Sequence, residues 1–79
     1  MIVFHSDGDK LTVDGHACYG TKGEDIVCAA VSILVFTAAQ DGTLEGKPGH
    51  AIVRSDSVEF AVTGLRLLEE QYPDFVREE

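Results

Sequence analysis

Cysteine, cationic side chains and long apolar segments are all scarce in this 79-residue chain, and each scarcity excludes a class of protein. The two cysteines, Cys18 and Cys28, are too few for a disulfide framework and do not have the spacing of metal sites, so we expect no metal and no cofactor. Six Lys and Arg against fourteen Asp and Glu give a net charge of −8. This charge opposes direct binding to nucleic-acid phosphates and suits a basic protein partner.

The sequence contains no recognisable targeting or membrane segment. Residues 1–7 have neither the basic region nor the long apolar run of a signal peptide. The apolar segment around Cys28 is too short, and too closely flanked by charge, to span a bilayer. We therefore expect a cytoplasmic protein with one domain over residues 1–79, and a core so small that it needs a partner subunit for support.

Alternating apolar residues and turn signals predict two β-hairpins. The predicted strands are residues 2–5, 10–14, 43–46 and 50–54. Asp7-Gly8 lies in the turn of the first hairpin, and Lys47-Pro48-Gly49 lies in the turn of the second. In the second predicted strand Leu11 and Val13 face the core, so strict alternation places His16 on the solvent side unless Gly15 allows a bulge.

The sequence also predicts two helices. The first runs from about Asp25 to about Gln40 and is apolar on nearly all sides. The second begins with an apparent capping box, in which Asp56 is the N-cap and Glu59 reaches back, and it ends near Tyr72. We therefore expect an α+β fold, a two-layer sandwich of a mainly antiparallel sheet, of about two hairpins, and two helices.

The start of the first predicted helix is the strongest candidate for a reactive site. If Asp25 is the N-cap, Cys28 lies in the first turn, where the helix dipole and unpaired N–H groups favour the thiolate. Ser32 lies on the same edge of the helix, four residues further on. The alternative is that Cys28 is only a small core residue, since cysteine is often buried. His16 is the candidate base; its alternative is a surface histidine, which is also how we interpret His5 and His50.

The connection from His16 to the helix contains Gly20 and Gly23. Two glycines in so short a segment suggest a mobile loop, whose conformation would decide whether His16 and Cys28 meet. An ordinary strand-to-helix connection explains the same glycines equally well.

Three segments of the sequence together resemble those of the ribosomal-processing cysteine protease family. They are Gly15-His16-Ala17, then Asp25-Ile26-Val27-Cys28-Ala29-Ala30-Val31-Ser32, and finally Leu67-Leu68-Glu69-Glu70-Gln71-Tyr72-Pro73-Asp74-Phe75-Val76. The resemblance implies an endopeptidase in which Cys28 is the nucleophile and His16 the general base, with a short last strand near residues 74–77. Asp25 would cap the helix or orient His16, and Ser32 and Gly15 would support the site.

The resemblance also implies a substrate. It is the short hydrophobic N-terminal extension of a bacterial large-subunit ribosomal protein, cut after hydrophobic and aromatic residues. By the same resemblance, phage scaffold or capsid proteins with a similar segment are a second possible substrate. This version is shorter than family members usually are around residues 42–54, and it could itself be phage-encoded.

Two interpretations from other classes remain open. One is a non-catalytic interaction module with Cys28 in its core, and the other is a thiol redox sensor that uses Cys18 and Cys28. In each case we expect a homodimer, because the first helix has no polar face on which its apolar surface could end. Val31, Val35 and Phe36 are the candidates for the part of that surface not covered by the sheet.

Overall fold

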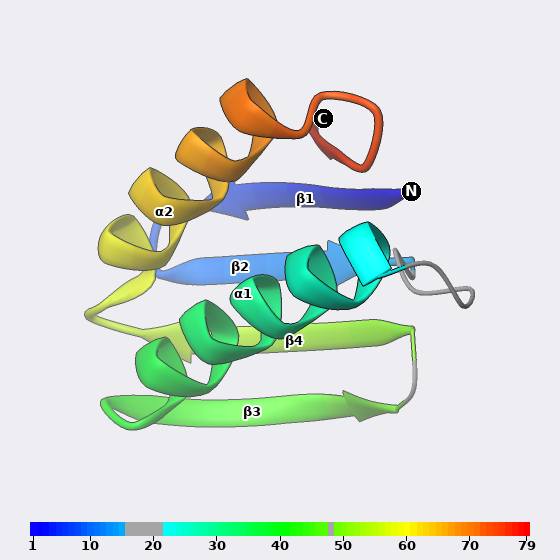
Figure 1. Cartoon of the computed structure of the whole chain (residues 1–79). Helices are drawn as coiled ribbons and strands as arrows, with labels where there is room; N and C mark the ends of the chain where they lie inside the picture. Colours follow the sequence, from blue (N-terminus) through cyan, green and yellow to red (C-terminus); the bar gives the residue numbers. More distant parts are fainter. Residues whose placement is uncertain (16–21, 48) are drawn as a thin grey trace.

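A computed structural model describes residues 1–15, 22–47 and 49–79 of the chain, without the side chains of residues 22–25. In chain order the elements are β1 (Ile2–Asp7), β2 (Lys10–Asp14), α1 (Lys22–Ala39), β3 (Gly42–Lys47), β4 (His50–Ser55), α2 (Val58–Gln71) and β5 (Val76–Glu78). The strands form one sheet in the order β3-β4-β2-β1-β5, and both helices lie across the same face of it (Figure 1). This is the α+β two-layer fold that the sequence predicts.

Both predicted hairpins are present, and the pairing of β2 with β4 joins them into one sheet. In the first hairpin Asp7 pairs with Lys10, so the turn is Gly8-Asp9, and Gly8 has a φ of 61°. A positive φ at the first turn residue matches the twist of the strands and favours glycine there. β5 pairs with β1 in the parallel direction, so the sheet is mixed but mostly antiparallel.

The core lies between the sheet and the helix layer. Alternate strand residues face the helices, and Phe4, Leu11 and Val53 are fully buried there. Val27 of α1 and Leu65 of α2 meet them from the helix layer and are fully buried as well. Burying a side chain of this size stabilises the fold by about 1.5–3 kcal/mol, so these few residues supply much of the stability of a small protein.

The first helix begins three residues earlier than the sequence predicts. Lys22 is its first residue, so Gly23, expected in the loop, is helical, and Asp25 is the fourth residue rather than the N-cap. Acidic residues are favoured inside the first turn of a helix as well as at its cap, because both positions feel the positive end of the dipole. An acidic residue near the start of a helix, such as Asp25, therefore fixes the helix end only to within a turn.

The capping-box prediction for the second helix is also wrong in detail. Ser57, not Asp56, is the N-cap of α2, and it makes no side-chain cap hydrogen bond. Its hydroxyl instead donates to the carboxylate of Asp41, just beyond the end of α1. Its N–H donates to Ser55 Oγ over 3.0 Å. The side chain at the actual N-cap position thus links the end of one helix to the start of the other.

The apolar surface of α1 is divided between core and solvent. Val31 and Val35, two of the residues expected to remain uncovered, are buried in the core, which corrects that expectation. Phe36, the third, is exposed, and so are Ile26 and Ile33. Among the residues that the structure describes, no helix combines the length and apolarity needed to cross a membrane.

Candidate active site

Cys28 lies half-buried on the underside of α1 and opens on a pocket between that helix and the sheet. Val31 and Ser32 line the same pocket, because positions three and four residues apart share one side of a helix. The pocket has a volume of about 520 Å³, and β3, β4 and the end of β2 form its other walls. A thiol at the wall of a pocket this large can meet a peptide, which a thiol sealed in the core cannot.

The early start of α1 changes the electrostatic argument for Cys28. Cys28 is the seventh residue of the helix and so lies in its second turn. The dipole effect falls off within the first turn, and the N–H groups left without helical acceptors belong to residues 22–25. The expectation that Cys28 lies in the first turn, where the dipole and unpaired N–H groups favour the thiolate, is therefore wrong for a helix with these bounds.

Gly15 forms another wall of the pocket, where β2 ends. Its φ is 98°, a conformation that side-chain-bearing residues rarely adopt, and an added Cβ would collide with the carbonyl oxygen of Met1. Its N–H donates to the carbonyl oxygen of Gly49 over 2.8 Å. The chain is therefore held closely at the residue that immediately precedes His16.

The predicted site residues fall into two groups. The structure brings Cys28, Ser32 and Gly15 to one pocket. His16, Cys18 and Gly20 lie outside the described residues, and only the backbone of Asp25 is described. The dyad of Cys28 and His16 therefore stays a prediction.

Sequence reasoning missed His50, which it assigns to the surface without a role. Its imidazole Nδ1 is hydrogen bonded to Asp14 Oδ1, across the pairing of β2 with β4. His50 lines the pocket at the start of β4, while alternation with Ala51 and Val53, which face the helices, turns its side chain and that of Asp14 toward the opposite face of the sheet. The pair thus ties the ends of two strands together beneath the pocket. Only the register of β2 against β4 could have revealed it.

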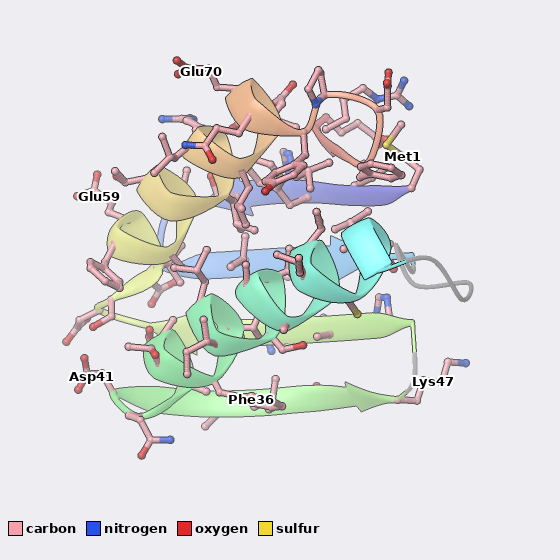
Figure 2. All side chains as sticks on the ribbon, in the orientation of Figure 1. Met1, Phe36, Asp41, Lys47, Glu59 and Glu70 are labelled. Carbon is pink, nitrogen blue, oxygen red and sulfur yellow. The ribbon has the colours of Figure 1, made fainter. Side chains whose placement is uncertain are left out.

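Three further lining residues carried no sequence signal for a site. Phe36 of α1 and Leu44 of β3 are exposed apolar side chains, and Lys47 ends β3. Figure 2 shows Phe36 extending from α1 over β3, and Lys47 reaching outward at the far end of that strand. The pocket wall is thus mainly apolar, with a cation at its margin.

Known proteins resemble this chain over nearly its whole length. The family model described as cysteine protease Prp matches residues 2–77. The ribosomal processing cysteine protease Prp of Mycoplasma pneumoniae is 33% identical over an alignment 93 positions long. The alignment covers 96% of this chain and 91% of that protein.

Solved structures share the fold as well. A Streptococcus mutans protein has a TM-score of 0.77 at 24% identity and covers 99% of this chain and 90% of its own, a likeness that concerns the fold alone. The Staphylococcus aureus ribosomal processing protease Prp, solved with a covalently linked product peptide, has a TM-score of 0.75 at 25% identity and covers 100% of this chain and 98% of its own. With the match over residues 2–77, the chain belongs to the Prp family of cysteine proteases, which are hydrolases.

Proposed function

We propose that this protein is an endopeptidase that removes a short hydrophobic N-terminal extension from a bacterial large-subunit ribosomal protein. The observation that carries the proposal is the position of Cys28 on the wall of a large, mainly apolar pocket. Such a pocket suits the side chains of a hydrophobic extension. Two relatives named as ribosomal processing proteases support the choice of substrate.

In the proposed mechanism Cys28 is the nucleophile and His16 the general base. His16 accepts the thiol proton while Cys28 Sγ forms a bond to the scissile carbonyl carbon. The imidazolium then donates that proton to the departing amine as the C–N bond breaks. Water hydrolyses the resulting thioester and restores the thiol. Gly15 supports this chemistry by fixing the end of β2 directly before His16.

Cleavage of the extended ribosomal protein tests the proposal. We expect Cys28→Ala to abolish cleavage and His16→Ala to lower kcat/KM by orders of magnitude, because members of a catalytic unit act together. Cys18→Ala is the matched cysteine control and should cleave normally. A redox sensor would instead form a Cys18–Cys28 disulfide under mild peroxide and cleave nothing. Cleavage of a phage scaffold protein but not of the ribosomal protein would reassign the substrate.

We also propose that Asp25 orients His16, because α1 begins at Lys22 and Asp25 is therefore not its N-cap. Asp25→Ser should then fold with a Tm close to that of the parent but lose much of its rate. Circular dichroism melting and peptide cleavage on the same sample separate the two effects. A lower Tm with an unchanged rate would show that Asp25 acts only on the helix.

The chain is further proposed to form a homodimer through the outer face of its helix layer. Leu34, Phe60, Gly64 and Leu67 line a hollow between α1 and α2. Phe60 and Leu67 are 61% and 54% exposed, which is unusual for side chains of this size. A second copy with the same surface would bury both in a closed two-fold pair.

A further inference from the structure

The end of β2 lies two residues before His16, the proposed base. Asp14 is the last residue of β2, and it is paired with His50, the first residue of β4. At the next position, the N–H of Gly15 donates to the carbonyl oxygen of Gly49 over 2.8 Å. The backbone that leads to His16 is therefore held at two successive residues by the segment in which β4 begins.

Asp14 and His50 are the last pair of side chains in the described register of β2 against β4. The two residues that follow this pair are glycines, and both have a positive φ, of 98° at Gly15 and 84° at Gly49. Contacts between side chains on neighbouring strands stabilise a strand pair, and two glycines cannot make one. Side-chain contact between the two strands therefore ends with Asp14 and His50.

A hydrogen bond joins these two side chains, between His50 Nδ1 and Asp14 Oδ1. The carboxylate accepts, so the imidazole donates its N–H from Nδ1. The side chains of His50 and Asp14 are 37% and 54% exposed, and pairs as exposed as this contribute little to the free energy of unfolding. The main effect of the hydrogen bond is therefore local, because it fixes where β2 ends relative to β4.

The position of the chain at the end of β2 matters because it borders the nucleophile. Gly15, Gly49 and His50 line the pocket that Cys28 also lines. A general base acts only within hydrogen-bond reach of the proton that it takes. A displacement of about 1 Å can lower the rate of such a site about 100-fold. A contact that fixes the end of β2 can therefore control whether His16 reaches Cys28.

We propose that His50 is a positioning residue, which acts through Asp14 to hold the chain before His16 so that the His16 imidazole meets the Cys28 thiol. His50 takes no proton from Cys28 and touches no reacting atom in this role. It sets the direction in which the chain leaves β2. The inference rests on the proposed function, because it requires His16 to be the base.

Alkylation of Cys28 by iodoacetamide at pH 7 tests this role without any substrate. In the Cys18→Ala protein Cys28 is the single remaining cysteine, and mass spectrometry gives its rate of alkylation. Because the thiolate reacts and the thiol does not, this rate reports how well His16 takes the proton. We expect His50→Ala and Asp14→Ala each to lower the rate by about five-fold or more. The double variant should lower it no further, because the two side chains act as a unit.

Two further variants of β4 serve as controls. His50→Asn places an N–H donor close to the position of Nδ1, so its rate should stay within about two-fold of the parent rate. Arg54→Ala removes an exposed side chain on the same face of β4, at the other end of the register with β2, and should leave the rate unchanged. If His50→Asn or Arg54→Ala is as slow as His50→Ala, the rate follows the strand pair as a whole and the positioning role is overturned. Circular dichroism melting should place all these variants close to the parent in Tm, because the pair is exposed.

The His16→Ala background shows whether His50 acts through His16. That change alone should lower the alkylation rate, and adding His50→Ala should then lower it no further. An equal loss from His50→Ala in both backgrounds, or an unchanged rate in His50→Ala, overturns the positioning role alone. An unchanged rate in His16→Ala would instead refute the proposed base, and this inference with it.

Discussion

Gly15 holds a backbone conformation that no other residue can adopt at that point without strain. Its positive φ and its closeness to Met1 both exclude a Cβ. Gly8 offers a matched comparison, because its φ is also positive, at 61°, but an added Cβ would meet nothing within 4 Å. The two glycines therefore separate conformational strain from collision.

We expect Gly15→Ala to destabilise the protein more than Gly8→Ala. A left-handed conformation costs alanine about 1–2 kcal/mol, and this is the whole cost at Gly8. At Gly15 the collision with Met1 adds to it. For a domain of this size each 1 kcal/mol lowers the Tm by about 4–8 °C, so thermal melting followed by circular dichroism resolves the difference. Equal losses in the two variants would show that β1 simply moves aside.

The ion pair between α2 and β5 fixes the last strand to the helix layer. Arg66 Nε and Nη2 donate to the two carboxylate oxygens of Glu78 over 2.9 and 3.0 Å. These hydrogen bonds, and then the charge of Arg66, hold the pKa of Glu78 below its ordinary value of 4.5. The Glu78 N–H also donates to Glu69 Oε1 over 3.2 Å, so two side chains of α2 hold one residue of the strand.

The stabilisation from this ion pair should depend on pH in a definite direction. A carboxyl group whose pKa is lower in the folded state stabilises the fold above its unfolded pKa, near 4.5. That stabilisation is lost as the pH falls through the folded pKa. We expect Glu78→Gln to melt slightly below the wild type at pH 7, by an amount that shrinks with added salt because the pair is exposed.

Melting curves between pH 7 and pH 3 test this dependence. The difference between wild type and Glu78→Gln should disappear at the acid end of the series. Glu45→Gln, at an exposed position on β3, is the control and should show no such convergence. A difference between wild type and Glu78→Gln that stays constant with pH would mean that the Arg66–Glu78 pair does not hold in solution.

How much the sequence could predict depended on the range of the interactions. Both hairpins were predicted correctly because alternation and turn residues are local signals, and Gly8 is one of them. The start of α1 was missed because Asp25 suits the first turn as well as the cap. The role of Ser57 depends on Asp41, and that of His50 on Asp14, and both partners are brought close only by the fold. The pairing of His16 with Cys28 stays a prediction from the family resemblance.

The oligomeric state can be measured directly on the whole molecule. Static light scattering at micromolar concentration should give twice the chain mass of 8.5 kDa, because pairing buries Phe60 and Leu67. Phe60→Asp should shift the mass to that of the monomer, since a charge would then face its own copy across the two-fold axis. A wild-type mass of 8.5 kDa would contradict the dimer and leave the helix layer open to water.

The parallel pairing of β1 with β5 has a consequence for synthesis on the ribosome. Ile2 of β1 pairs with Val76 of β5, so one edge of β1 is covered by a segment from the other end of the described sequence. At about 5–20 residues per second, β1 is made roughly 4–15 s before its partner. For that time an apolar strand has an unpaired edge, the kind of edge at which nascent chains aggregate. Shielding of the emerging chain by a chaperone should therefore matter most for the first hairpin.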